Sequence, residues 1–479
     1  MKNILIAIRS IFKKGRHNVM KIVSLGIGLA VGLVLIAKVY FEQSYDDFYP
    51  DRDRVYQVWA KYQQKGGELK DYPQTSGGIA PTMQQQIPEI ETVTRYTSFG
   101  DWTFTMTDTK MKYSGRCIIA DSCFFDILPR PMLIGNAKEV LSTPMYVLIS
   151  SRIAKNIGGD VIGKNFTVDN SPGRTMTIGG VFEEVPENSH SRYDVIVSMA
   201  SAGRFMWEGS PTNMLGNDRY ISYVKLHKGV NPLALEEQVR TFVNSYFPPE
   251  EQQKVGLSID FSFHKLDNLH KELPQVKRMT WILSLLAFAL IFTAVMNYIL
   301  IVISSIVNRS KEVAVHKCYG ASENNIHGMM FGEALVHIVL SLILALLLIL
   351  AFRGTVEELL ATSLDSLLLS NGSLVLLGIC ILVFFVSGFM PGSLYARIPV
   401  ASAFRNYREN KRIWKKALLL VQFVATGFLV TMLVFVARQY TFMVNDRPGY
   451  AYENLAYCGL AGVDSTSRAK ILDEVMRLP

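Results

Sequence analysis

Five apolar stretches of this sequence are each long enough to cross a lipid bilayer as a helix, and they limit the fold more than any other feature. A bilayer helix needs about 20 mainly apolar residues to span a hydrocarbon core of about 30 Å. The chain of 479 residues is 49% hydrophobic and only 19% charged, whereas an average soluble domain has about 25% charged residues. We therefore predict an α-helical membrane protein with transmembrane helices at residues 22–41, 279–307, 331–352, 373–396 and 417–438.

Basic residues predict how these helices are oriented. Residues 1–21 hold six lysines or arginines and no acid, and residues 397–416 hold seven against one acid. Because cytoplasmic loops carry an excess of lysine and arginine, we expect this arm, this linker and residues 308–330 in the cytoplasm. The segments expected outside are 42–278, 353–372 and 439–479. Since the basic arm adjoins a span, we interpret its charge as a topology signal that contacts anionic lipid, and we expect no nucleic-acid partner.

Residues 42–278 are long enough to form a domain with its own core. Strand-like runs such as 55–60 and 175–181 alternate with helix-like runs such as 232–246, and this mixture predicts an extracytoplasmic α+β domain. Residues 439–479 start a similar stretch after the fifth span but are too few to bury a core. We interpret this layout as a duplicated architecture, and we expect a truncated sequence that lacks three further spans.

The sequence has no clear catalytic or metal-binding pattern. Residues 158–164, GGDVIGK, fit half of a phosphate-binding loop, but Asn165 stands where that loop needs a hydroxyl ligand for magnesium. A structural turn is therefore favoured. Cys117 and Cys123 face an oxidising compartment in which a disulfide would persist, although two buried thiols are the favoured interpretation. We expect no enzyme activity, cofactor or metal in this chain.

A few polar and small residues within the spans predict how the helices pack. A lone amide in lipid is costly, so Asn297 should face other helices. Glu333 and His337 lie four residues apart on one helix face near its cytoplasmic end, where packing or hydrogen bonding is favoured over a metal site or proton relay. Gly28 and Gly32 offer a smooth face for close helix approach, or reflect only the frequency of glycine in membrane helices.

The stretch from Asn297 to Ser322 straddles the cytoplasmic end of the second span. An uncharged helix continues into a charged one and stops at Gly320, which suits a left-handed helix terminator. Ser322 can cap the next helix. A stiff rod that leaves the membrane and ends in a tight turn has the geometry to pass force to a cytoplasmic partner, although an ordinary charged loop is an equally good interpretation of the residues alone.

This stretch resembles the N-Y-(x)n-R-x-K-E-(I/V)-x-(I/V)-x-K-x-x-G-A signature of the FtsX/MacB-type ABC transporter permease family. The matching residues are Asn297, Tyr298, Arg309, Lys311, Glu312, Lys317, Gly320 and Ala321. Segments 44–56, 120–126 and 162–164 resemble landmarks of the family's periplasmic core domain, and 391–423 resembles the joint between repeats of its eight-span members. His316, Cys318 and Tyr319 depart from the usual pattern. The layout is most similar to the duplicated permeases of Bacteroidetes-like bacteria.

The resemblance implies a permease of the bacterial inner membrane, with a cytoplasmic N-terminus and a MacB-like periplasmic core domain. A separate cytoplasmic ABC ATPase would bind ATP and dock on residues 308–330, with a periplasmic or outer-membrane partner and a dimer-like assembly of repeats. The residues implied in coupling and docking are Arg309, Lys311, Glu312, Lys317, Gly320 and Ala321. The family's functions include export and mechanotransmission. The alternative is a non-transporting signalling or scaffold protein that regulates a periplasmic enzyme such as a cell-wall hydrolase.

Overall fold

The computed structural model describes residues 17–168, 171–369, 371–396, 400, 413–445 and 465–477. Most of the predicted basic arm and of the basic linker lies outside the described residues, as do residues 446–464. The chain divides into two compact units. Unit 1 comprises Met1–Gln43 and Pro274–Leu455, and unit 2 comprises Ser44–Leu273 and Ala456–Pro479.

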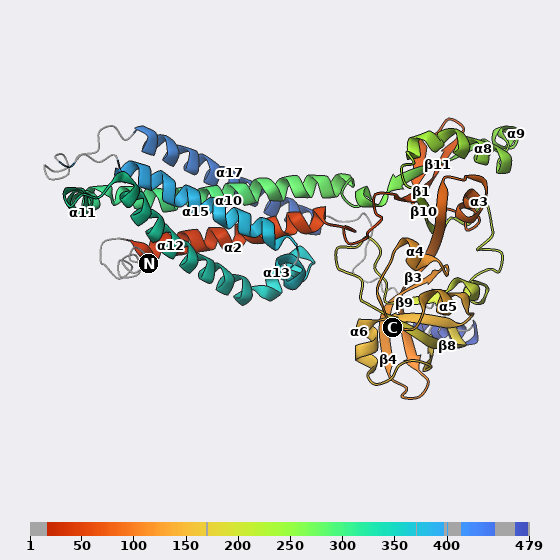
Figure 1. The fold of residues 1–479 in the computed structure, drawn as a ribbon. Helices are drawn as coiled ribbons and strands as arrows, with labels where there is room; N and C mark the ends of the chain where they lie inside the picture. Colours follow the sequence, from red (N-terminus) through yellow and green to blue (C-terminus); the bar gives the residue numbers. More distant parts are fainter. Residues whose placement is uncertain are drawn as a thin grey trace. The chain divides into compact units, whose positions relative to one another are not determined.

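Unit 1 is helical (Figure 1). Among the residues that the structure describes, five helices are long and apolar enough to cross a membrane, as predicted. These helices are α2 (Asn18–Gln43), α10 (Pro274–Ser304), α12 (Glu323–Ala351), α15 (Ser373–Ala396) and α17 (Ile413–Asn445). The charged helix α11 (Ile306–Cys318) connects α10 to α12. Two short helices, α13 (Arg353–Leu360) and α14 (Leu364–Leu368), form the loop between α12 and α15.

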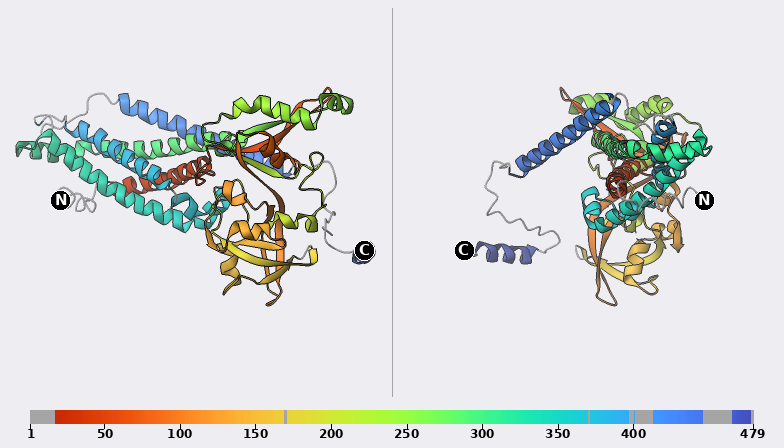
Figure 2. Two further views of the ribbon diagram at one scale, coloured as in Figure 1. Left: turned by 45° about the vertical axis from the view of Figure 1, so that its right-hand side comes forward. Right: turned by 90° about the vertical axis from the view of Figure 1, so that its left-hand side faces the viewer.

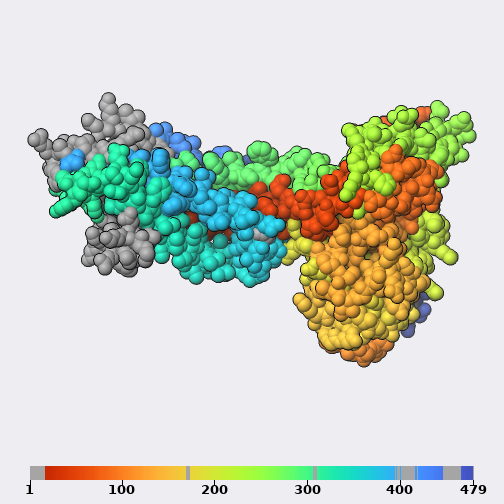
Figure 3. All heavy atoms as spheres, viewed as in Figure 1, coloured from red at the N-terminus to blue at the C-terminus, as the bar shows by residue number. Residues whose placement is uncertain are grey.

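Four of the long helices of unit 1 pack against one another. Helix α2 lies against α10 and α12, and α15 lies against α10 and α12 (Figure 3). Helix α17 makes few contacts, and only 6% of its apolar window is buried, compared with 44% for α2. Figure 2 shows α17 at the edge of this bundle.

Two glycines explain the close approach of α2 and α10. A Cβ atom added at Gly28 would overlap the Cβ of Ala294, and one added at Gly32 would overlap the side chain of Ile291. Side chains at both α2 positions would therefore force the helices apart, since packed interiors have no room for extra atoms. The structure confirms that the Gly28 and Gly32 face of α2 serves helix packing.

A buried ion pair lies at the C-terminal end of α2. The ammonium group of Lys38 is 2.7 Å from the carboxylate of Glu42 and donates a hydrogen bond of 2.7 Å to the hydroxyl of Thr362. Both charged side chains are less than 10% exposed. Because buried charges need partners, this contact fixes the loop between α13 and α14 against α2.

Unit 2 is built on one mixed sheet. Its strands are β1 (Val55–Gln64), β2 (Leu69–Tyr72), β3 (Ile90–Met106), β4 (Lys112–Ala120), β5 (Met132–Ile134), β6 (Tyr146–Ser150), β7 (Asn165–Val168), β8 (Ser171–Phe182), β9 (Val195–Ser198), β10 (Ile221–Leu226) and β11 (Leu257–Lys265). The order is β11-β1-β10-β3-β4-β9-β6-β8-β5; β2 pairs with β1, and β7 pairs with both β3 and β8.

Strand β7 closes part of this sheet into a small barrel. Because β7 pairs with the end of β3 at Phe104–Met106 and with β8, the path β3-β4-β9-β6-β8-β7 returns to β3. Apolar side chains of these strands, among them Phe104, Phe166 and Val197, fill the barrel interior and are almost completely buried. In a barrel this small, side chains fill the space.

The other end of the sheet is covered by helices. Strands β11, β1, β10 and the first half of β3 bury one face beneath α3 (Ile79–Gln86) and α8 (Glu236–Tyr246), with Val58, Met83 and Phe242 in the shared core. The remaining helices are α4 (Phe124–Ile127), α5 (Ala137–Ser142), α6 (Ser151–Ile157), α7 (Ala202–Phe205), α9 (Pro249–Val255) and α18 (Ser465–Met476). The predicted α+β domain is therefore confirmed.

Candidate functional site

The predicted coupling residues lie in one helical hairpin of unit 1, formed by α11 and the start of α12. We call residues 306–326 the coupling hairpin. Lys311 is exposed, whereas Glu312, Lys317 and Ala321 are half-buried. The backbone of Arg309 lies in α11, but its side chain lies outside the described residues. The buried face of α11 includes Val313 and Ala314.

The turn of the coupling hairpin is a Schellman motif at Gly320. The N–H of Gly320 donates to the carbonyl of Lys317 and that of Ala321 donates to His316, both at 3.0 Å. Gly320 has φ +85°, a left-handed conformation that favours glycine. The side chain of Ser322 accepts a hydrogen bond from the N–H of Asn325 and caps α12. The structure confirms both the predicted stop and the predicted cap.

The outer surface of the coupling hairpin carries apolar groups beside its charges. Tyr319, directly before Gly320, is 88% exposed, and Val315, one turn earlier on α11, is 42% exposed. Exposed aromatic residues surrounded by polar groups are typical of interaction sites.

The predicted continuous rod is broken. Helix α10 ends at Ser304 and α11 begins at Ile306, with Ser305 between them. Pairs of small residues such as Ser304 and Ser305 are common sites of helix kinks. The uncharged and charged parts of this segment are therefore two helices and not one uninterrupted shaft.

A column of polar side chains on α12 faces α2 and α10. Glu333 lies 3.6 Å from the ammonium group of Lys21 on α2, and Nδ1 of His337 lies 3.2 Å from the hydroxyl of Tyr298 on α10. The hydroxyl of Ser341, one further turn along, donates to the carbonyl of Ile22 at 3.1 Å. These contacts join three helices through their polar groups.

The predicted packing residue Asn297 lies directly before Tyr298 on α10. Its side chain is half-buried and makes no hydrogen bond with any residue that the structure describes. Tyr298, which is 2% exposed, makes the polar contact instead. The assignment of Asn297 to helix packing stays a prediction.

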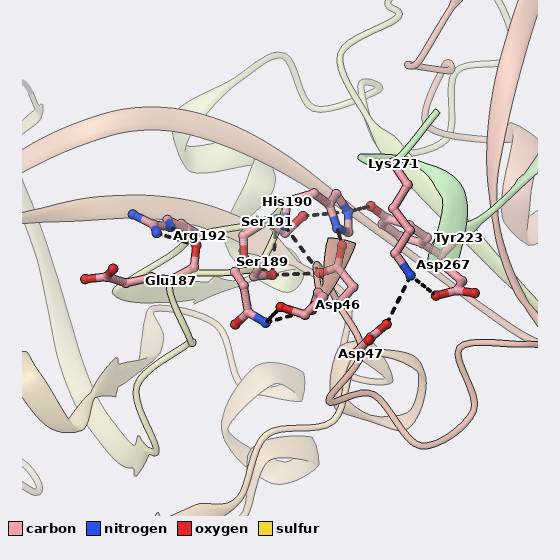
Figure 4. Close-up of polar contacts among 12 residues, drawn as sticks. Asp46, Asp47, Glu187, Ser189, His190, Ser191, Arg192, Tyr223, Asp267 and Lys271 are labelled. Carbon is pink, nitrogen blue, oxygen red and sulfur yellow. Dashed lines mark hydrogen bonds and ion pairs between the residues drawn. The ribbon is translucent and has the colours of Figure 1, made fainter. Parts of the chain in front are cut away.

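In unit 2, the chain segments that follow α2 and precede α10 are held together. The ring of Tyr45 stacks on that of His270, with centroids 3.4 Å apart. The ammonium group of Lys271 bridges Asp47 at 3.2 Å and Asp267 at 2.8 Å (Figure 4). We call Tyr45, Asp47, Asp267, His270 and Lys271 the stalk clamp.

The charges of the stalk clamp stabilise one another. Burial opposes ionisation of Asp267, but the hydrogen bond and charge of Lys271, together with Arg52, outweigh it and lower the pKa of Asp267. Burial likewise disfavours the ammonium form of Lys271, but its hydrogen bonds to Asp267 and Asp47 outweigh this effect and raise the pKa of Lys271. Each pair is partly exposed and individually weak, so the clamp depends on the network and on the stacked rings.

Asp46, between two clamp residues, inserts its side chain into a buried polar cluster. Its carboxylate accepts hydrogen bonds from the hydroxyl of Ser189 at 3.0 Å, from the backbone N–H of His190 at 3.3 Å and from Nδ1–H of His190 at 2.7 Å. The Nε2 atom of His190 then faces the hydroxyls of Tyr223 and Ser191 (Figure 4). We call this cluster the Asp46 hub.

The Asp46 hub combines burial of a carboxylate with a backbone conformation that few residues adopt. The Asp46 side chain is 1% exposed, and its φ of +61° is a left-handed value that aspartate tolerates better than most residues. Burial raises the pKa of Tyr96, whose hydroxyl lies 2.5 Å from that of Ser191, to about 12. Burial also raises the pKa of Tyr223 well above its usual value, so both phenols are neutral hydrogen-bonding groups.

Sequence reasoning did not identify the stalk clamp or the Asp46 hub. The segment containing Tyr45 and Asp46 was singled out only for its family resemblance, and His190 belongs to no spacing pattern. The partners of Asp46 lie 143 and 144 residues away along the chain. No local signal connects residues so far apart.

Two other sequence features have structural roles. Gly158, Gly159 and Gly163 all have positive φ values and form a turn after α6 and before β7. A phosphate-binding loop instead lies between a strand and the N-terminus of a helix, so the structural-turn interpretation is confirmed. Cys117 and Cys123 are free thiols, and burial raises the pKa of both.

Two family models match the sequence. The MacB-like periplasmic core domain matches residues 20–242, and the FtsX-like permease C-terminal domain matches residues 284–400. Together the matches cover well over half of the chain. The sequence matches none of the curated proteins.

Three solved structures are similar to parts of this chain. A domain of a putative permease protein from Porphyromonas gingivalis is 33% identical, with 45% of this chain and 91% of that chain covered and a TM-score of 0.42. The periplasmic region of MacB from Actinobacillus actinomycetemcomitans is 16% identical over 46% and 92% of the two chains, with a TM-score of 0.30. The extracellular domain of the noncanonic ABC-type transporter YknZ from Gram-positive bacteria is 11% identical over 43% and 98%, also with a TM-score of 0.30.

The two family matches lie in the order that the fold requires, with the first extending from α2 into unit 2 and the second running from α10 to the end of α15. The sequence identity to the Porphyromonas gingivalis domain extends over nearly all of that domain. The chain therefore belongs to the FtsX/MacB-type permease family, as a membrane protein with a MacB-like periplasmic core domain and an FtsX-like permease domain.

Proposed function

We propose that this chain is the permease subunit of an ABC transporter and that it transmits conformational change from a separate cytoplasmic ATPase to unit 2. It works in a bacterial inner membrane with its N-terminus and coupling hairpin in the cytoplasm and unit 2 in the periplasm. ATP is bound and hydrolysed by the partner subunit. The observation that carries the proposal is the continuity of the chain from the stalk clamp, through α10, to the coupling hairpin.

Helix α10 has the length needed for this task. Its 31 residues correspond to about 46 Å at 1.5 Å per residue, more than the bilayer core of about 30 Å. Pro274 begins the helix three positions after Lys271 of the stalk clamp, and Ser304 ends it just before α11. Helix α10 therefore connects the stalk clamp directly to α11, and a displacement of one end of the helix is transmitted to the residues at its other end.

Helix α2 provides a second connection. Its close packing on α10 at Gly28 and Gly32 favours movement of the two helices as a pair. Beyond their ends, the stalk clamp joins Tyr45 to His270 and Asp47 to Lys271. The Asp46 hub then attaches the segment after α2 to the β8–β9 connection and to β10 through His190 and Tyr223. These contacts supply a route for force into the periplasmic sheet.

The coupling hairpin offers a suitable surface for the ATPase. Tyr319 and Val315 provide exposed apolar area, and Lys311 adds an exposed charge. The hydrogen-bonded turn at Gly320 connects this part of α11 to the start of α12. The partner must contact two conformations of the hairpin with different affinity, since a partner that binds both equally shifts no equilibrium.

The test is to purify the full chain with the ATPase that binds it and to measure ATP turnover with and without the permease. Replacing Gly320 by Ala, or Glu312 by Ala, should abolish permease-stimulated turnover while the complex still inserts and assembles. Gly378→Ala is the matched control, because a Cβ at Gly378 in α15 meets open space and no left-handed conformation is needed there.

Unchanged stimulation in Gly320→Ala and Glu312→Ala would contradict the coupling assignment. Recovery of a cell-wall hydrolase or a sensor kinase as the main partner, without an ATPase, would favour a non-transporting signalling or scaffold protein. Adding candidate peptides or lipoproteins to the ATPase assay would distinguish export from pure mechanotransmission.

A further inference from the structure

Hydrogen bonds from α15 and from Ser305 itself meet at the break between α10 and α11. Three donor groups converge on the carbonyl oxygen of Val302: the N–H of Ser305 at 3.2 Å, the hydroxyl of Ser305 at 2.6 Å and the hydroxyl of Tyr395 at 3.1 Å. The hydroxyls of Ser305 and Tyr395 are also 3.2 Å apart. The break is therefore a specific, bonded structure.

Tyr395 reaches the break from α15, which lies about 90 residues further along the chain. Its side chain is completely buried, and Ser305 is only 5% exposed. A buried phenol hydroxyl must find a partner, and here that partner is the backbone of another helix at the position where the helix is interrupted.

The same part of α15 also contacts α12 just beyond the coupling hairpin. A Cβ at Gly388 would come within 2.5 Å of Phe331, and a Cβ at Gly392 would come within 2.7 Å of Nδ1 of His327. Phe331 and His327 both lie in the first turns of α12. The C-terminal turns of α15 thus contact α10 at its break and α12 near its start, on both sides of the coupling hairpin.

Pro391 lies inside this part of α15. Proline lacks an N–H and cannot donate the helical hydrogen bond to the carbonyl one turn before it, so α15 lacks one backbone hydrogen bond beside the break in α10. Helix kinks concentrate at prolines and at pairs of small residues, so Pro391 in α15 and the Ser304–Ser305 pair in α10 favour a joint at this level.

We propose that Tyr395 is a positioning residue that locks the joint at Ser305, with the end of α15 as the fulcrum of the coupling hairpin. When Tyr395 bonds Val302, α11 has a fixed direction relative to α10, and movement of the hairpin is delivered to α10. When this bond opens, the hairpin swings at Ser305 without moving α10. This inference rests on the proposed function, since it names the residue on which transmission of movement from the coupling hairpin to α10 depends.

The experiment compares Tyr395→Phe with Tyr298→Phe in the full chain. Tyr395→Phe keeps the ring and removes the hydroxyl at the joint. Tyr298→Phe is a matched control, because Tyr298 is an equally buried tyrosine of the same bundle whose hydroxyl bonds His337 and not the break. Spin labels on the exposed native Cys318 of α11 and on a cysteine at the exposed position Phe288 of α10 report the angle between the helices, with the other cysteines replaced.

In Tyr395→Phe we expect a broader distance distribution between the labels and about fivefold lower permease-stimulated kcat, the change that corresponds to losing one ordinary hydrogen bond. The KM for ATP and the amount of bound ATPase should stay unchanged. Tyr298→Phe should leave the distance distribution as in the parent protein.

An unchanged label distribution in Tyr395→Phe would overturn the inference, as would a changed distribution with unchanged stimulated kcat. Equal broadening in Tyr298→Phe would also overturn it, because the joint would then not depend on Tyr395 in particular. If no ATPase binds the parent protein, the proposed function fails, and the label distances alone still decide whether Tyr395 locks the joint.

Discussion

The ammonium group of Lys21 on α2 lies 3.6 Å from the carboxylate of Glu333 on α12, and both side chains are at least 90% buried. Lys21 also donates a hydrogen bond of 3.3 Å to the side chain of Asn18. The sequence placed Lys21 in a basic arm at the membrane surface. In the structure it belongs to α2 and joins that helix to the column of polar residues on α12.

Replacing only one member of the Lys21–Glu333 pair should destabilise the protein. Lys21→Met or Glu333→Gln should lower the free energy of unfolding by about 3–5 kcal/mol, because each leaves a buried charge without its partner. The double variant Lys21→Met/Glu333→Met should be closer to the parent protein than either single variant. Thermal unfolding of the detergent-solubilised protein measures the effect, and strictly additive losses would show that the two groups do not interact.

The contact between α2 and α10 predicts a steric effect. Gly28→Ala should destabilise the protein by about 1–3 kcal/mol, because the added methyl group overlaps Ala294 and forces the helices apart. Gly427→Ala in α17 is the control, since a Cβ there meets nothing within 4 Å, and alanine favours a helix over glycine. A melting temperature that falls equally in both variants would argue against close packing at Gly28.

The Asp46 hub predicts a graded series. Asp46→Ala should cost about 2–3 kcal/mol of stability, because it leaves the donors of Ser189 and His190 buried without an acceptor. Asp46→Asn should cost less, since asparagine keeps an acceptor and tolerates the left-handed backbone. We expect both to reduce permease-stimulated ATP turnover more than Asp101→Asn, a control whose side chain is 78% exposed. If permease-stimulated ATP turnover were normal in Asp46→Ala, the hub would not be needed for transmission.

His264 predicts a pH dependence of stability. Its ring stacks on Trp59 with centroids 4.2 Å apart, and burial lowers the pKa of His264 below its usual 6.5. The unfolded chain therefore binds this proton more readily, so the stabilisation is present above pH 6.5 and is lost as the pH falls through the folded pKa. The melting temperature should be lower at pH 5.5 than at pH 7.5.

His264→Gln should reduce this difference between the two pH values, whereas His227→Gln should retain it, because His227 is exposed. Thermal unfolding followed by tryptophan fluorescence provides the measurement. An identical pH dependence in the parent protein and in His264→Gln would contradict the assignment to His264.

Local patterns in the sequence predicted much of the fold. Hydropathy located all five membrane helices, because an apolar run of about 20 residues has few stable alternatives to a bilayer span. The strand-like runs 55–60 and 175–181 fell within β1 and β8, but the longest strand, β3, was missed. Strand β3 has a bulge between Ser98 and Gly100, and it passes from the helix-covered part of the sheet into the barrel. Both features interrupt the alternation of apolar and polar residues on which strand prediction depends.

In the candidate site, too, features set by neighbouring residues were predictable from the sequence, and features set by contacts between helices were not. Gly320 and Ser322 could be recognised from sequence because a helix stop and a cap depend on residues within one turn of the chain. The joint at Ser305 was missed, and a continuous rod was expected, because the break is bonded to Tyr395 on a different helix.

The sequence by itself determined that this chain has membrane helices, an extracytoplasmic α+β domain and a tight charged hairpin, since each follows from composition or from neighbouring residues. Only the tertiary structure decided that Asp46 is anchored by His190, that Lys21 is paired with Glu333 and that Tyr395 holds the break in α10. Such contacts join residues far apart in the chain, and they form only when packing brings those residues within the 3 to 4 Å over which hydrogen bonds and ion pairs act.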